Sequence, residues 1–472
     1  MQQGLNILWF EQDLRLADNL ALTAAIAQGK VLAIYILDQH NTGAHSMGAA
    51  SRWWLHHSLQ ALDTDLGGKL NFYQGDPHTI INQLRQRLSI AGVYWNRRYE
   101  PWRIQRDKHI KQQLSSQGIT AKSYKSSLLH EPWTICNKEG NPYQVFTPYH
   151  RQASLLDDDM APLPAPNLTT GLEVDSQAGK LPDFMLLPKV AWDSQFYKCW
   201  KPGERGACDA LNRFLANGIS QYQKGRDWPA SNAVSKLSPH LHFGELSPRQ
   251  TMQSLLRIAN DNNSEHFKRE IRWREFAYYL LYYWPHLPSR NLRVSFDQFP
   301  WHNQADCLTR WQQGRTGYPL VDAGMRELWQ TGYMHNRVRM ITASFLVKNL
   351  LIDWRLGWQW FWDCLVDADL ASNSASWQWV AGCGADAAPY FRIFNPITQG
   401  EKFDPQGAYT RRYIPELQDL PDKYLYKPWQ APEGVLRQAK VELGQTYPLP
   451  MVDINTSRQA ALAAYALLKK GN

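Results

Sequence analysis

The sequence predicts two fold classes in one chain: an α/β domain with a doubly wound parallel sheet, followed after a long connector by an all-α domain. Three observations support this prediction. Short apolar runs alternate with helical patterns over residues 1–130, periodicity fades over 131–191, and almost every periodic segment of 192–472 has helical spacing. Alternating strand and helix units form parallel sheets that are covered on both faces.

Five apolar runs of the first domain have the length and composition of buried strands. The segments between them carry apolar residues at helical spacings. Asp76-Pro77 predicts a helix over His78–Leu88, because a carboxylate can cap the first turn and proline fits its first position. The predicted strands are Leu5–Phe10, Val31–Leu37, Leu70–Gln74, Gly92–Asn96 and Ala121–Leu129.

The connector contains the Pro-rich run Ala161–Pro166, which is typical of an inter-domain segment. Beyond it, helical periodicity dominates, and a closing helix is predicted over Ser457–Lys470. The other clear helices of this domain are Ala207–Asn217, Pro248–Ala259, Ser264–Tyr283, Tyr318–Gly332 and Arg337–Leu351.

Composition excludes several classes of protein. No run of eighteen apolar residues occurs, and Met1–Gly4 lacks the basic and apolar regions of a signal peptide, so we expect a cytoplasmic protein that neither enters a membrane nor is secreted. Six cysteines without a CxxC pair indicate reduced thiols and no metal site. A net charge of +8 suits a polyanionic partner, but many ordinary soluble proteins have a similar balance.

Tryptophan is concentrated in the helical domain. Of 21 tryptophans, eleven lie between Trp273 and Trp379. Leu and Ile fill a helical core without an indole N–H that needs a partner, so this density favours a stacking or redox role.

Glu270, Trp273 and Arg274 share one face of a predicted helix, at positions i, i+3 and i+4. A carboxylate, a flat aromatic ring and a guanidinium on one stripe can hydrogen-bond to a base and stack on it. An amphipathic helix with a salt bridge explains the same spacing.

Asn336, Arg339 and Met340 lie on adjoining faces of another helix start, beside Arg337. Asn can pair with a base edge, Met offers a polarisable apolar contact, and arginine suits phosphate. A solvated basic helix is the alternative.

Asp367, Asp369 and Asn373 form a third pattern. Without His or further carboxylates at ligand spacing, hydrogen bonds to sugar hydroxyls or a ring amide fit better than a metal. A helix cap is the alternative.

The fourth pattern combines Tyr222 with Ser235–His240, where small hydroxyls precede a predicted helix start at Pro239. Such a segment can present donors to a phosphate. An ordinary N-cap is the more frequent explanation of such a segment.

Taken together, these residues resemble the DNA photolyase and cryptochrome family of flavoproteins, and most closely its bacterial cyclobutane pyrimidine dimer photolyases of the class I type. The resemblance covers nearly the whole chain, although Glu11 stands where the family usually has arginine. The motifs that carry it are Trp9–Asn19, Gly314–Pro319, His335–Arg337 and Asp386–Pro396.

The resemblance implies FAD bound in the helical domain. Asn373 would then lie against the flavin nitrogen that is protonated on reduction, where a neutral amide does not oppose an anionic reduced flavin as a carboxylate would. Phe267 occupies a place where bacterial relatives often have Trp. Further contacts implied for the phosphates are Tyr222, Ser235, Lys236, Leu237 and Ser238, and for the flavin and ribose Phe267, Arg274, Arg339, Asp367 and Asp369.

The implied substrate is DNA with a cyclobutane dimer turned out of the helix. Photolyases for the six-four lesion would carry histidine at Asn336 and Met340, so the cyclobutane dimer is expected here. Glu270 would hydrogen-bond to the dimer and protonate its transient anion. The dimer contacts are Glu270, Trp273, Asn336, Arg337, Met340 and Trp379, and the DNA contacts around them Arg226, Arg337, Arg392 and Gln399.

A tryptophan relay that reduces resting flavin is implied at Trp377, Trp354 and Trp301. A second, light-harvesting chromophore of folate, deazaflavin or flavin type can accompany this fold, but Asn96–Trp102 lacks the Asn-Glu pair of the folate pattern. We expect a monomer. The alternatives are a cryptochrome photoreceptor, a light-independent helical flavoprotein and a plain DNA-binding module.

Overall fold

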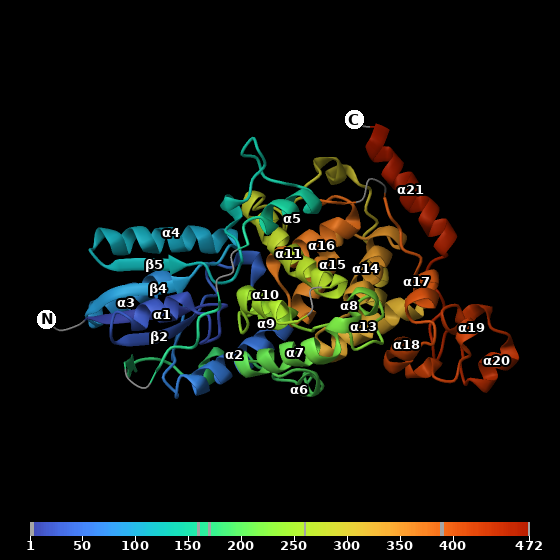
Figure 1. Ribbon diagram of the computed structural model, residues 1–472. Helices are drawn as coiled ribbons and strands as arrows, with labels where there is room; N and C mark the ends of the chain where they lie inside the picture. The colour runs from blue at the N-terminus through green and yellow to red at the C-terminus, as the bar shows by residue number, and fades with distance from the viewer. Residues whose placement is uncertain (1–3, 158–160, 169–170, 259–260, 388–390, 471–472) are drawn as a thin grey trace.

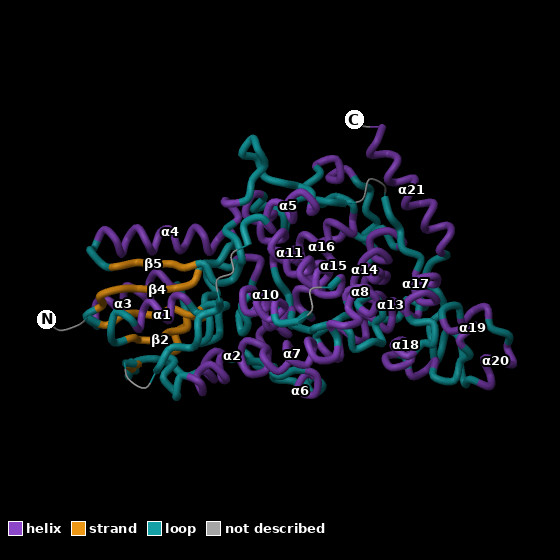
Figure 2. Tube along the Cα trace, in the orientation of Figure 1, coloured by secondary structure: helices purple, strands orange, loops and turns teal. Residues whose placement is uncertain are grey.

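A computed structural model describes residues 4–157, 161–168, 171–258, 261–387 and 391–470. A parallel sheet with its helices occupies one side of the molecule and a mass of helices the other, as Figure 2 shows. The predicted fold class is therefore confirmed. No helix among the described residues is both long and apolar enough to cross a bilayer.

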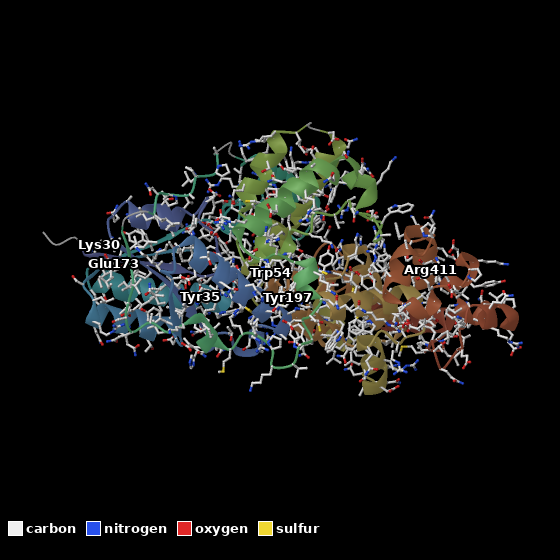
Figure 3. The ribbon with its side chains drawn as sticks, turned by 90° about the horizontal axis from the view of Figure 1, so that it is seen from below. Lys30, Tyr35, Trp54, Glu173, Tyr197 and Arg411 are labelled. Atoms are coloured by element: carbon white, nitrogen blue, oxygen red, sulfur yellow. The ribbon has the colours of Figure 1, made fainter. Side chains whose placement is uncertain are left out.

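The sheet is doubly wound, with strand order β3-β2-β1-β4-β5 and all pairs parallel. Strand β6 also pairs with β2, where the Lys30–Glu173 ion pair of 2.6 Å joins the two chain segments (Figure 3). The strands are β1 Leu5–Phe10, β2 Val31–Leu37, β3 Asn71–Gln74, β4 Ile90–Asn96, β5 Thr120–Tyr124 and β6 Leu172–Glu173.

Both faces of the central strands β1 and β2 are buried, which explains why these two strands are continuous apolar runs. In β1, Ile7 and Trp9 join one apolar cluster and Leu8 and Phe10 the other, as alternation along a strand requires. Asp76 caps its helix as predicted, accepting from the Thr79 N–H at 3.0 Å. The covering helices are α1 Leu20–Ile26, α2 Ala49–Asp65, α3 Pro77–Arg87 and α4 Pro101–Ser116.

Two predictions in this half need correction. The strand predicted over Ala121–Leu129 ends at Tyr124, because beyond it the backbone turns toward the helical domain. The connector is also more structured than its weak periodicity indicates, since it forms helix α5 (Phe146–Ser154) and strand β6.

The helical domain surrounds the long helix α11, which packs against α16 (Figure 1). Helix α14 is shorter than the predicted Arg337–Leu351, because a π-turn at Phe345–Asn349 ends it. Residue 259 of another predicted helix, Pro248–Ala259, lies outside the described residues. The helices are α6 Phe196–Cys199, α7 Glu204–Asn217, α8 Tyr222–Gly225, α9 Ser238–His242, α10 Pro248–Leu256, α11 Asn262–Tyr283, α12 Ala305–Gln312, α13 Pro319–Thr331, α14 Asn336–Ser344, α15 Trp354–Cys364, α16 Leu370–Ala381, α17 Pro396–Phe403, α18 Ala408–Tyr413, α19 Asp422–Leu425, α20 Glu433–Gln438 and α21 Ile454–Lys470.

The two domains meet at the carboxyl ends of β1 and β4, the point where the strand order reverses. Gly244, with φ of +66°, lies so close to this edge that a Cβ atom would come within 2.2 Å of the Gln12 carbonyl oxygen. The unusual Glu11 is explained here, because its carboxylate pairs with buried Arg106 at 2.5 Å. The sheet edge is therefore a docking surface for the helical domain.

Candidate active site

One large cavity of about 750 Å³ opens in the helical domain, a volume typical of a cofactor site. Its walls come from α8, α9, α11, α14, α15 and α16 and from the segment after α16. Most of the predicted site residues meet here although the sequence separates them widely. Those that line the cavity are Tyr222, Arg226, Ser235, Leu237, Ser238, Phe267, Glu270, Trp273, Arg274, Asn336, Arg339, Met340, Asp367, Asp369, Asn373, Trp377, Trp379 and Arg392.

An ion pair between Arg339 and Asp367 forms part of the cavity floor. The guanidinium approaches both carboxylate oxygens, at 2.9 and 3.1 Å, and Ser238 donates its hydroxyl to the same carboxylate at 2.5 Å. Ser238 begins helix α9 without capping it, so the N-cap interpretation of this segment is wrong. The hydroxyl instead serves the cavity.

Asp369 caps a helix and also joins a hydrogen-bond network at the cavity wall, so the helix-cap interpretation holds and the ligand role stays a prediction. One oxygen caps α16 by accepting from the Ser372 N–H at 2.8 Å, and the other lies 3.1 Å from His242 Nδ1 and accepts from the Tyr278 hydroxyl. Burial would raise the pKa of Asp369, but these hydrogen bonds, the nearby His242 and the Arg274 charge hold it far below its ordinary value. Asp369 is therefore an anion at the cavity wall.

A buried hydrogen-bond network extends from Asp369 into the α/β domain. His242 Nε2 lies 2.9 Å from Gln12 Nε2, Gln12 accepts from Arg98 at 2.7 Å, and Arg98 pairs with Glu100 at 2.8 Å. Arg98 and Arg103 outweigh the effect of burial and hold the pKa of Glu100 at about 2. The sheet domain thus helps to position a carboxylate of the helical cavity.

Asn373 and Arg274 reach the cavity from facing helices. The Asn373 amide nitrogen donates to the Trp358 carbonyl at 3.2 Å, which leaves the amide oxygen to accept from a ligand. Arg274 donates to the backbone carbonyls of Ser127 and Leu241, at 2.8 and 3.3 Å. Both side chains are held by backbone groups and are therefore preorganised.

The face predicted from Glu270 and Trp273 is present, but its ion pair differs from the expected one. Glu270 pairs with Arg226 of the segment after α8 rather than with Arg274. Trp273 stacks on Phe146 of the connector, with ring centroids 3.7 Å apart and planes at 8°. The connector therefore fixes the orientation of the tryptophan that lines the cavity.

Five predicted residues do not line the cavity. Arg337 pairs with Asp227 at 2.7 Å, Gln399 lies on α17, and Lys236 has a left-handed backbone and places its ammonium over Trp200 and Tyr333. The other two are Trp354 and Trp301.

The three relay tryptophans lie on neighbouring segments. Trp377 of α16 lines the cavity and packs against α15 at Gly357, on the same helix as buried Trp354. The chain at His302 hydrogen-bonds to Leu351, which places partly buried Trp301 close to the start of α15. Among the described residues, no ring contact joins the three indoles to one another, so the electron relay stays a prediction.

Sequence reasoning missed several residues of this site: Gln12, Phe146, Asp227, His242 and Tyr278. They lie in other segments than the four motifs, and each acts through a neighbour distant in sequence. Residues 388–390 of the Asp386–Pro396 motif lie outside the described residues.

The chain is similar to known proteins along its whole length. A family model described as DNA photolyase matches residues 6–167, and one described as the FAD binding domain of DNA photolyase matches residues 267–467. A deoxyribodipyrimidine photo-lyase of Agrobacterium fabrum is 50% identical, with 98% of each chain covered. Cryptochrome-1 of Arabidopsis thaliana is 37% identical, with 96% of this chain and 69% of the relative covered.

A solved structure is also similar to this chain along its whole length. The crystal structure of a bacterial class III photolyase from Agrobacterium tumefaciens matches with a TM-score of 0.96 and 49% identity, covering 100% of this chain and 98% of that one. The class I-like assignment made from the sequence motifs is not supported by this likeness.

Proposed function

Because the chain belongs to the DNA photolyase and cryptochrome family, we propose that it is a deoxyribodipyrimidine photo-lyase that repairs cyclobutane pyrimidine dimers in DNA under light. One observation carries this proposal. Residues expected to contact the flavin and residues expected to contact the dimer line the same cavity: Asp369 and Asn373 are buried in its wall, and Glu270, Trp273 and Asn336 also line it.

The lining suits FAD. Buried anionic Asp369 can accept from ribose hydroxyls or a ring N–H, and the Asn373 oxygen offers a neutral acceptor. The Ser235 hydroxyl and the Ser238 backbone N–H at the first position of α9 are donors suited to phosphates, while the Leu237 N–H donates to the Ser235 hydroxyl at 3.4 Å. FAD, when bound and reduced, would supply the photoexcited electron that splits the two ring bonds of the dimer and then returns, so that no net redox change results.

The dimer would enter beside Glu270. In the protein alone this carboxylate pairs with Arg226, so substrate entry would replace one hydrogen bond of Glu270 by another and free Arg226 for a DNA phosphate. Trp273, held flat against Phe146, would stack on the flipped bases. In its acid form, once Arg226 has moved to the DNA, Glu270 would also donate a proton to the transient dimer anion and regain it when the electron returns to the flavin.

Around the opening of the cavity, DNA phosphates would be contacted by arginines that are either exposed or paired with a carboxylate that a phosphate can replace. Arg392 is exposed and lines the cavity, whereas Arg337 would exchange Asp227 for a phosphate. Gln399 of α17 would join them through its side-chain amide N–H groups, which can donate to a phosphate. Binding by such contacts weakens steeply with salt.

Blue-light repair is the decisive test. Reduced, flavin-loaded protein should remove dimers from irradiated DNA under blue light and not in darkness. Glu270→Ala should lower both repair yield and dimer affinity. A flavin-loaded protein that removes no dimers in the light would overturn the proposal.

A cryptochrome-type photoreceptor is the second candidate, favoured by the 37% identity to a plant cryptochrome. Retention of Glu270, Trp273 and Asn336 around the cavity favours repair. Preferential binding of dimer-containing over undamaged DNA separates the two functions.

We also propose the relay from Trp301 through Trp354 to Trp377 as the route that reduces resting flavin. Trp301→Phe should abolish photoreduction and leave repair by chemically reduced protein intact. A second chromophore stays a prediction, and no type is assigned to it. In the segment Asn96–Trp102, Asn96 donates to Asp13 at 2.6 Å and Arg98 pairs with Glu100, so both side chains are used within the protein. An absorption spectrum of the native protein tests it.

A further inference from the structure

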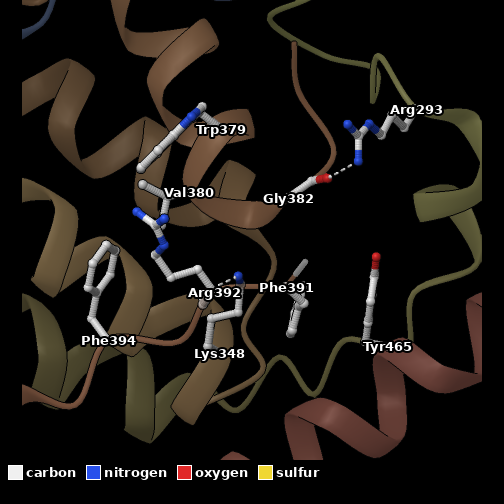
Figure 4. A pocket seen from close by; sticks show the side chains of 9 residues that line it. All are labelled: Arg293, Lys348, Trp379, Val380, Gly382, Phe391, Arg392, Phe394 and Tyr465. Atoms are coloured by element: carbon white, nitrogen blue, oxygen red, sulfur yellow. Dashed lines mark hydrogen bonds between the residues drawn. The ribbon is translucent and has the colours of Figure 1, made fainter. Parts of the chain in front are cut away.

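Lys348 is a buried lysine behind the segment that carries Arg392. Lys348 is 2% exposed, and among the described residues it forms no ion pair with a carboxylate. Its ammonium donates to the Arg392 carbonyl at 2.9 Å and lies 3.6 Å from the centroid of the Phe391 ring (Figure 4). Lysine is almost never fully buried unless it has such partners, so this arrangement calls for a role.

The local helix geometry aims Lys348 at this segment. The residue lies in the π-turn Phe345–Asn349, and such turns displace side chains from their regular helical directions and are frequent at functional sites. Four residues earlier, the Ser344 hydroxyl accepts from the Phe394 N–H at 3.2 Å. One helix end therefore holds the segment 391–394 at two backbone groups.

Before residue 388, the same loop is held by side chains that lie outside the π-turn. Arg293 donates to the Ala387 carbonyl at 3.3 Å, and the Trp379 indole donates to the Asp386 carbonyl at 3.1 Å. A cavity of about 20 Å³, room for about one water molecule, lies between the loop and its supports. Its lining residues are Arg293, Lys348, Trp379, Val380, Gly382, Phe391, Arg392, Phe394 and Tyr465.

This loop also forms part of the large cavity. Ala385, Asp386 and Arg392 line the proposed dimer and flavin site. A shift of the backbone at residue 392 would therefore move the Arg392 guanidinium relative to a phosphate beside the flipped dimer.

We propose that Lys348 is a positioning residue for DNA binding: its protonated side chain holds the backbone of residues 391–394 so that Arg392 meets the DNA beside the dimer. The inference rests on the proposed function and deepens it. Lys348 itself touches neither DNA nor flavin.

The hold of Lys348 on the loop should depend on pH, given the ionisable groups around it. The ionisable groups around it are Arg293 from the segment before α12, Arg392 and Cys383 from the loop, and Tyr465 from α21. Burial lowers the pKa of Lys348 to about 7 and is only slightly opposed by Cys383. Above this pH the neutral amine loses its attraction to the carbonyl dipole and the ring face, and the hold on the loop weakens.

The test measures the dissociation constant of the full-length, flavin-loaded protein for a dimer-containing oligonucleotide between about pH 6 and about pH 8.5, on both sides of the pKa. Wild type should lose about fivefold to tenfold in affinity over this range, which is less than a whole charge-assisted hydrogen bond because the neutral amine can still donate to the carbonyl. Lys348→Met should bind weakly with a flatter profile. Lys348→Arg should keep its charge and stay flat while binding more tightly than Lys348→Met.

Three controls separate positioning from misfolding. Flavin content and thermal unfolding should match wild type in at least one of the two variants. The slope of log affinity against log salt should fall in Lys348→Met, as in Arg392→Ala, because Arg392 loses its phosphate contact, and should stay near the wild-type value in Lys348→Arg. In an Arg392→Ala background, Lys348→Met should cause little further loss, because the two residues act through one contact.

Failure of the positioning role of Lys348 and failure of the proposed function would give different results. If Lys348→Met binds dimers as tightly as wild type, or follows the same pH profile, Lys348 has no positioning role. If wild type prefers no dimer at any pH and repairs none in light, the proposed function itself fails.

Discussion

Gly357→Ala is a sharp test of how Trp377 is placed. A Cβ atom at Gly357 would lie 2.2 Å from Cη2 of Trp377 and 2.6 Å from Cδ2 of Leu346. Tight real contacts of this kind start at about 3.0 Å, so the indole would have to move by roughly 1 Å. Trp377 is 2% exposed and has Phe361 on another side, with ring centroids 5.0 Å apart, so its one open direction is the cavity.

Two effects oppose each other at this position. Alanine favours a helix over glycine by about 0.5–1 kcal/mol, whereas forcing an extra carbon into a packed core costs about 1–3 kcal/mol. We therefore expect the free energy of unfolding to fall by about 1–2 kcal/mol. The displaced indole narrows the cavity, so flavin content should fall as well.

Gly434→Ala is the matched control. Gly434 lies in helix α20 with no atom within 4 Å of an added Cβ, so only the helix propensity acts there and stability should rise slightly. Urea unfolding and the ratio of flavin to protein absorbance measure both variants. If Gly357→Ala is as stable and as rich in flavin as Gly434→Ala, Trp377 does not occupy the place described above.

Three other predictions concern single residues. Arg392→Ala should reduce the slope of log affinity against log salt by about one in a titration of DNA binding, and an unchanged slope would remove its phosphate contact. Phe146→Ala should lower the free energy of unfolding by about 3 kcal/mol and weaken dimer binding, because Trp273 loses its stacking partner; dimer affinity equal to wild type would show that the stack is dispensable. Because the folded pKa of Lys348 is about 7 against 10.5 in the unfolded chain, the unfolded state binds more protons between these values. Stability should rise with pH across that interval in urea unfolding, less so in Lys348→Met, and an equal rise in both would contradict the lowered pKa.

Much of the fold could be predicted because the signals are local. Strand β1 reads as an apolar run since both faces of the sheet are covered, and Asp76 caps its helix through a bond to a residue three positions away. The strand order was not predictable, because it depends on pairings such as β1 with β4 between distant segments. Strand β6, two residues long, has no periodicity to detect.

The site shows the same division. Glu270 and Trp273 were predicted to share a face because helical spacing alone requires it. Their partners were not predictable: Arg226 is 44 residues from Glu270, and Phe146 lies in the connector, which has no clear periodicity. The spacing allowed a salt bridge within the helix as the alternative interpretation, but folding brings Arg226 to Glu270.

The sequence by itself determined the two fold classes, most of the residues that line the cavity and the family, because periodicity, capping and motifs depend on neighbours along the chain. The tertiary structure alone decided which charges are paired, which are buried and which elements support the cavity from behind. Asp369 is kept anionic by His242, 127 positions away, and Lys348 is buried against a loop that begins more than thirty residues later. Desolvation and ion pairing depend on neighbours in space, and those neighbours exist only once the chain has folded.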